Sequence, residues 1–197
     1  MVGGALKPTE HRSVELGQAL QSAERAVALD ANDNVCHWAL GETAFHSCQI
    51  ERALAHLDKA LALNPNDADV LIVSGYVHCA VGDPELGFRQ IAMAMERNPS
   101  NPTWYNWLLG ICLCLHGRHH DALQELDRYV PPNPNVMKWR AFALTKLGRA
   151  DEARAQIADL LAVVPEIRLS TLAAHAVEIR RIRDDFLATM RHAGIPD

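Results

Sequence analysis

The sequence predicts an all-α protein built as a solenoid of antiparallel helix pairs. Of its 197 residues, 49% are hydrophobic, and much of that apolar mass is Ala and Leu, which favour helices over strands. Small residues recur at separations near 34 residues, and prolines recur with them. A unit of that length accommodates two helices, which bury their apolar faces by stacking on the next unit.

Four columns of residues carry the repeat, and all four share separations of 34, 35 and 31 residues. Small residues form the first two columns: Gly41, Gly75, Gly110 and Ala141, then Ala53, Gly87, Ala122 and Ala153. The third and fourth columns are Ala60, Ala94, Tyr129 and Leu160, then Pro65, Pro99, Pro134 and Pro165. A fifth column of Leu or Ile agrees with them: Leu57, Ile91, Leu126 and Ile157. Small residues let paired helices approach closely, and proline ends a helix.

The columns divide the chain into segments. We expect a flexible N-terminal segment, an orphan or capping helix equivalent to half a repeat, four repeats and an amphipathic C-terminal tail. In chain order, these segments are 1–10, 11–33, 34–67, 68–101, 102–133, 134–167 and 168–197. The third repeat is shortened, and it ends in the proline-rich stretch 131–134. We therefore expect irregular stacking between the third and fourth repeats.

Local signals bound the predicted helices. Asp83 and Asn101 each precede a proline, and we expect both to be N-caps. Glycines fall at the turns inside three hairpins, where a positive φ is required: Gly82, Gly117 and Gly148.

In the tail, apolar residues recur at three- and four-residue steps, which indicates one amphipathic helix or two. Gly194 is placed to end the last of them. The tail either caps the fourth repeat, folds back into the concave face as an internal ligand, or forms a dimer.

The columns resemble the tetratricopeptide repeat (TPR) across about residues 34 to 167. The resemblance implies a right-handed superhelix, or alpha-alpha superhelix, in which the first helix of each pair lines a concave groove that binds a peptide or helix of a partner protein. We take Asn34, Ala68, Thr103 and Pro134 as the first residues of the four repeats. The pattern departs from the family where it usually has Trp, because His37, Leu71, Asn106 and Met137 stand there.

In this register, positions 2, 5, 9 and 12 of each repeat are expected to face the groove. The residues we predict to bind the partner are Trp38, Glu42, Phe45, Asp69, Ile72, Tyr76, Trp104, Trp107, Ile111, Asn135, Lys138 and Phe142. The groove is predicted to be aromatic, which disfavours a clamp for a terminal carboxylate. A one-position shift of register would instead place Trp38 and Trp107 in the core between helices.

A second resemblance concerns two short stretches. Residues 104–110, Trp-Tyr-Asn-Trp-Leu-Leu-Gly, and the ending 190–197 are similar to C-terminal repeat regions of bacterial multidomain regulators, which carry a class III adenylate cyclase or a winged-helix domain. The resemblance implies an alternative function, as a regulatory or self-association segment of a larger signalling enzyme or transcription regulator. None of that catalytic or DNA-binding activity would reside in these residues.

Other function classes find little support. The net charge of −5 and the pI near 6.0 oppose nucleic-acid binding, because that requires clustered Lys and Arg. We expect a soluble, cytoplasmic protein without a membrane segment, cofactor or enzymatic activity. The five cysteines lack CxxC spacing and are expected to be reduced thiols. We interpret the histidine-rich stretch 116–121 as a polar turn, with a zinc site as the weaker alternative. The partner is expected to be a protein or peptide, and a homodimer is left open.

Overall fold

The computed structural model describes residues 8–130, 133–175 and 179–197, and these residues contain eleven helices and no strand. The helices are α1 (Pro8–Leu29), α2 (Asn34–His46), α3 (Ile50–Leu63), α4 (Ala68–Val81), α5 (Pro84–Arg97), α6 (Thr103–Leu115), α7 (His119–Leu126), α8 (Pro134–Lys146), α9 (Ala150–Val163), α10 (Leu169–His175) and α11 (Arg183–Ala193).

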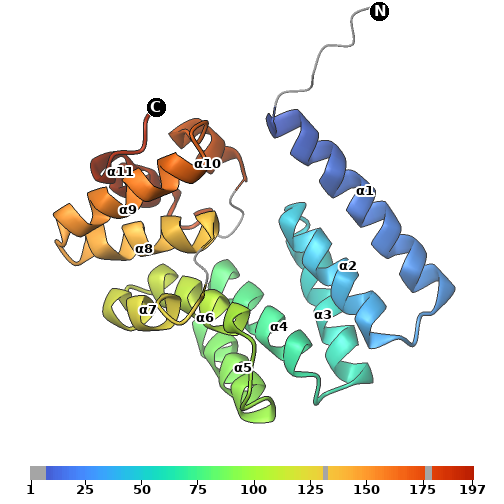
Figure 1. The fold of residues 1–197 in the computed structure, drawn as a ribbon. Coiled ribbons are helices and arrows are strands. Elements are labelled where there is room, and N and C mark those ends of the chain that lie inside the picture. Colours follow the sequence, from blue (N-terminus) through green and yellow to red (C-terminus); the bar gives the residue numbers. More distant parts are fainter. Residues whose placement is uncertain (1–7, 131–132, 176–178) are drawn as a thin grey trace, which may run out of the picture.

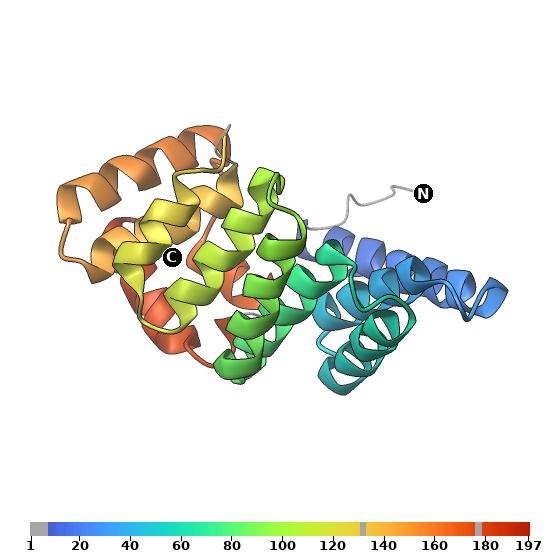
Figure 2. The ribbon, with the colours of Figure 1, turned by 90° about the horizontal axis from the view of Figure 1, so that it is seen from below.

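Consecutive helices pack as antiparallel pairs, and the pairs wind into a superhelix (Figures 1 and 2). The pairs are α2 with α3, α4 with α5, α6 with α7, and α8 with α9. The superhelix bends so far that α10, near the C-terminus, contacts α1 at the other end. The predicted fold class is thus confirmed.

The first helix of each pair begins at the residue that the repeat columns designate. These helices are α2, α4, α6 and α8, and they begin at Asn34, Ala68, Thr103 and Pro134. Three of them are capped by a side chain, because Asp33, Asp67 and Asn133 accept hydrogen bonds from backbone N–H groups in the first turn.

The two N-caps predicted from a following proline have different outcomes. Asp83 is the N-cap of α5, as predicted, and its carboxylate accepts a hydrogen bond from the backbone N–H of Leu86. The prediction that Asn101 caps α6 is wrong, since Pro102 occupies the N-cap position and makes no side-chain cap. Pro102 has an extended conformation, with ψ of 153°, so helical dihedrals begin one residue later.

Two of the predicted columns meet inside the hairpins. A Cβ built on Gly41 would lie 2.8 Å from Cγ of Leu57, and one built on Gly110 would lie 2.6 Å from Cγ of Leu126. The small residue on the first helix therefore makes room for the large apolar residue on the second. The turns behave as expected too, with positive φ at Gly82, Gly117 and Gly148.

The ends of the repeat region differ from the expected boundaries. The helix expected over 11–33 begins earlier, at Pro8, while most of the segment 1–10 lies outside the described residues. The shortened third repeat also has a shorter second helix, since α7 has 8 residues where α3, α5 and α9 have 14. None of the helices in the described part combines the length and apolar character that crossing a bilayer requires.

In its described residues, the tail contains the two helices α10 and α11, and α11 covers the last repeat. It packs against α8 and α9, and its Phe186 ring stacks on Phe142 with centroids 5.1 Å apart. Gly194 ends α11 with φ of 112°, as the sequence predicts. The chain is then tied back, because the backbone N–H of Leu169 donates to the carbonyl of Pro196 at 2.9 Å.

A histidine pair joins α2 to α3. The Nδ1 atoms of His37 and His56 lie 2.9 Å apart, and Nε2 of His37 is 3.1 Å from the carbonyl oxygen of Ala31. Nε2 must carry a proton to bond that carbonyl, so a neutral His37 accepts at Nδ1 and His56 donates. Burial, followed by the neighbouring His37 and Arg52, lowers the pKa of His56.

Because the pKa of His56 is lowered, we expect the protein to lose stability in mild acid. A histidine whose pKa is lowered by folding is stabilising above its unfolded value of about 6.5, and that stability is lost as the pH falls through the lowered value. We expect the free energy of unfolding to fall between pH 7.5 and pH 5, and to fall less in H56Q. Urea unfolding at both pH values measures this, with the exposed His120 replaced by Gln as the control. An equal pH dependence in wild type and H56Q would contradict it.

Candidate functional site

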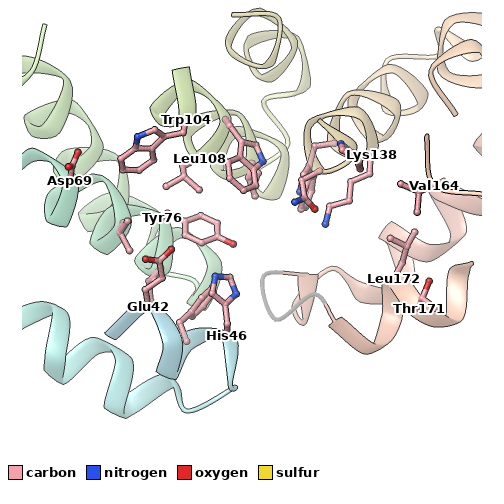
Figure 3. A pocket seen from close by; sticks show the side chains of 18 of the residues that line it. Glu42, His46, Asp69, Tyr76, Trp104, Leu108, Lys138, Val164, Thr171 and Leu172 are labelled. Atoms are coloured by element: carbon pink, nitrogen blue, oxygen red, sulfur yellow. The ribbon is translucent and has the colours of Figure 1, made fainter. Parts of the chain in front are cut away.

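A cavity of about 600 Å³ lies on the concave side of the superhelix (Figure 3). Its walls come from the first helices of all four pairs, α2, α4, α6 and α8. The residues that follow α9, Val164 and Ile167, and the helix α10 close the opposite side. A volume of this size is typical of sites that take a small ligand or a few side chains of a peptide.

Helical periodicity positions the walls. On α2, Trp38, Glu42 and Phe45 follow one another at steps of four and three residues, so they share one face. On α6, Trp104, Trp107 and Ile111 follow one another at steps of three and four residues, so they also share one face. Stacking of the repeats then brings these faces to one side of the superhelix.

Ten of the twelve predicted partner-binding residues line the cavity. They are Trp38, Glu42, Phe45, Asp69, Tyr76, Trp104, Trp107, Ile111, Asn135 and Lys138. Ile72 does not line the cavity, and its side chain is fully buried. Phe142 does not either, because Phe186 and Trp139 cover its ring. The tail helix α11 thus covers the ring of Phe142, which is not available to line the groove.

The prediction missed ten lining residues, which fall into two groups. Six come from the first helices: His46, Val73, Val77, Leu108, Pro134 and Trp139. Val73, Val77 and Leu108 lie four or eight residues after a predicted residue, so a wider stripe on each helix would have found them. Four come from the tail and its approach: Val164, Ile167, Thr171 and Leu172. The repeat columns end at Pro165, and the sequence left open whether the tail covers the concave face, so these four residues were not predicted.

The two carboxylates in the wall differ in their surroundings. Asp69 accepts a hydrogen bond from the Tyr105 hydroxyl at 2.5 Å. Burial, and then this hydrogen bond, raises the pKa of Tyr105. Glu42 is half-buried, and no described residue is hydrogen-bonded or ion-paired to its carboxylate. Burial alone raises the pKa of Glu42.

The rest of the polar lining is sparse. Lys138, on α8, is the only Lys or Arg among the described residues of the wall. The indole Nε1 atoms of Trp38, Trp107 and Trp139 are buried, and they meet no acceptor within the described residues. The lining of the cavity therefore combines aromatic surface, one carboxylate that no described residue pairs and three tryptophans whose buried N–H groups meet no acceptor in the described residues.

The histidine-rich turn after α6 lies elsewhere. Nε2 of His116 bonds the carbonyl of Cys79 at 3.0 Å, and the His119 ring packs edge-on against Phe142. The described residues contain no group of three His, Cys, Asp or Glu placed to hold a metal ion. All five cysteines are free, and three of them are buried.

Comparisons with known proteins place the fold. Residues 35–67 match the tetratricopeptide repeat family model, and this stretch coincides with the first predicted repeat. The solved structure of PilW, a widely conserved type IV pilus biogenesis factor, is similar with a TM-score of 0.68 and 20% identity, covering 93% of this chain and 83% of PilW. PilF of Pseudomonas aeruginosa is similar with a TM-score of 0.61 and 17% identity, covering 89% of this chain and 80% of PilF.

A third solved structure is that of YrrB, described as a TPR protein with an unusual peptide-binding site. It has a TM-score of 0.55 and 21% identity, and the match covers 89% of this chain and 92% of YrrB. These likenesses show the tetratricopeptide superhelix. No curated protein sequence matches the chain. None of the three structures is described as a cyclase or a winged-helix regulator, so the predicted relation to such regulators stays a prediction.

Proposed function

We propose that this chain is a protein-interaction scaffold whose concave cavity binds a segment of a partner protein through apolar side chains. The observation that carries the proposal is the aromatic wall formed by three successive repeats. Trp38 comes from the first repeat, Tyr76 from the second, and Trp104 and Trp107 from the third. Aromatic side chains in a pocket supply much of the binding energy of interfaces.

The fold supports an interaction role rather than catalysis. Solenoids of stacked helix pairs offer an extended concave surface, which suits a peptide or helix better than a small substrate. YrrB, which shares the fold, is described as having a peptide-binding site.

Recognition of a terminal carboxylate is not the proposed mode. Such a clamp needs several Lys, Arg and Asn side chains converging from adjacent helices. Here Asn135 and Lys138 are the candidates, and both belong to α8. The proposed occupant is therefore an internal segment with apolar anchors.

Loss of two tryptophans tests the proposal. Peptides are selected on the wild-type protein from a random dodecapeptide library displayed on phage, and the dissociation constant of the best is measured by calorimetry. We expect W104A and W107A each to weaken binding at least about tenfold, because each removes an aromatic anchor from the wall. The exposed Leu147, outside the cavity, is replaced by Ala as the control. Unchanged affinity in both tryptophan variants, with unchanged helical circular dichroism, would contradict the groove.

A second candidate function is a regulatory or self-association segment of a larger bacterial signalling protein. One observation favours it: α1 exposes the large apolar side chains of Val14 and Leu29. Light scattering over a hundredfold range of concentration tests self-association. A constant monomer mass would remove the self-association part of this candidate.

A further inference from the structure

We infer that the segment bound in this cavity carries a basic side chain, Arg or Lys, which pairs with the Glu42 carboxylate beside Tyr76 and Trp104. The inference rests on the proposed function and specifies the chemistry of the partner. Figure 3 shows the Glu42 carboxylate directed into the cavity, on the side where Tyr76 and Trp104 also lie.

The unbound cavity holds a carboxylate that no described residue pairs. A carboxylate that is withdrawn from water without a partner is destabilised, and buried charges in proteins are therefore normally paired. Glu42 is half-buried, yet no described residue is paired with it, and burial raises its pKa. A cationic side chain entering the cavity would supply the missing partner in a place where water screens the pair poorly.

The two carboxylates of the wall differ in what they do for the fold. Asp69 already accepts the Tyr105 hydroxyl at 2.5 Å, and that bond ties α6 to α4. Glu42 makes no comparable bond within the described residues. Asp69 thus has a structural role, whereas Glu42 contributes nothing to the fold that would require a charged side chain at its position.

The aromatic side chains of the wall also favour a cation. Trp38 precedes Glu42 by one helical turn, and Tyr76 and Trp104 belong to the same wall. Aromatic faces attract cations, Arg most often, so these rings favour a guanidinium or an ammonium over a neutral donor. Leu and Val side chains elsewhere in the wall suit the methylene stem of Arg or Lys and an apolar neighbour in the peptide.

The charges of the wall also give the site a polarity. Glu42 belongs to the first repeat and Lys138 to the fourth, on opposite sides of the cavity in Figure 3. An acidic side chain placed at the α2 side would be repelled by Glu42. The basic residue of the occupant is therefore assigned to the α2 side.

The experiment selects random dodecapeptides on phage with the wild-type protein and, in parallel, with E42Q. We expect the wild type to enrich peptides that carry Arg or Lys next to apolar residues, and E42Q to lose the basic preference. For the best wild-type peptide, E42Q should bind at least about tenfold more weakly, because the ion pair becomes a neutral contact. The control E96Q removes a charge from an exposed site on α5, and it should leave the affinity unchanged.

A change in the peptide tests the same pair on the unmodified protein. Replacing the basic residue by citrulline, if it is Arg, or by acetyl-lysine, if it is Lys, keeps its length and removes its charge. The wild type should lose at least about tenfold in affinity, and E42Q should lose little further, since both changes delete one interaction. The peptide arm needs no altered protein, so it decides the question even if E42Q folds poorly.

The outcomes separate the inference from the proposed function. Apolar peptides without a basic residue, or a basic preference that persists in E42Q, would overturn the inference and leave the peptide-binding groove standing. Enrichment of acidic peptides would also overturn it, and would indicate recognition through Lys138. Failure of the wild type to select any peptide would remove both.

Discussion

Replacing Gly75 by alanine is expected to lower the free energy of unfolding by about 2 to 3 kcal/mol, because the new methyl group has no room. A Cβ at this position would lie 2.6 Å from the carbonyl oxygen of Gly87 and 2.8 Å from Cγ1 of Ile91. One of these neighbours is backbone, so relief requires α4 and α5 to separate. Urea unfolding monitored by circular dichroism measures the change.

A matched substitution shows the opposite sign. Gly17, in the middle of α1, has nothing within 4 Å of a built Cβ. Gly17→Ala is expected to stabilise the protein by up to about 1 kcal/mol, because alanine favours the helix more than glycine does. The pair separates the effect of close packing from the effect of helix propensity. If Gly75→Ala were as stable as the wild type, the close approach of α4 and α5 would be wrong.

Truncating Phe186 should have a still larger effect. We expect Phe186→Ala to cost about 3 to 5 kcal/mol, because it removes a fully buried ring from the interface between α11 and the last repeat. The ring lies 5.1 Å from the centroid of Phe142 and 5.0 Å from that of Trp139. Its loss leaves a cavity under α11 and weakens the cover over α8.

The unfolding midpoint of Phe186→Ala in urea measures this cost. The exposed Asp184, on the same helix, is replaced by Ala as the control, and that change should stay within about 0.5 kcal/mol of the wild type. A cost below about 1 kcal/mol for Phe186→Ala would contradict a capping role for α11. It would then leave the tail free to serve as a dimer element.

The tail shows why the three alternatives drawn from the sequence are not exclusive. Its second helix, α11, covers the fourth repeat, as a capping helix does. Its first helix, α10, contributes Thr171 and Leu172 to the cavity wall. The amphipathic pattern predicts that the tail has an apolar face, but it does not say which surface that face covers.

Much of the site follows from the helical register. A fixed period and a helical face are local properties, so the sequence places Trp38, Tyr76 and Trp104 on the inner helices without further information. Ile72 and Phe142 obey the same register but do not reach the cavity. Their exposure depends on neighbours that the register does not contain, above all Phe186 for Phe142.

The sequence by itself determined the helical class, the pairing of helices and the first residue of each inner helix, because small residues, prolines and caps act within one repeat. Only the tertiary structure decided that the superhelix bends until α10 closes the concave side, and that α11 covers Phe142. It also separated Asp69, bonded to Tyr105, from Glu42, which no described residue pairs. These outcomes depend on contacts between residues far apart in the chain, and no periodic pattern records such contacts.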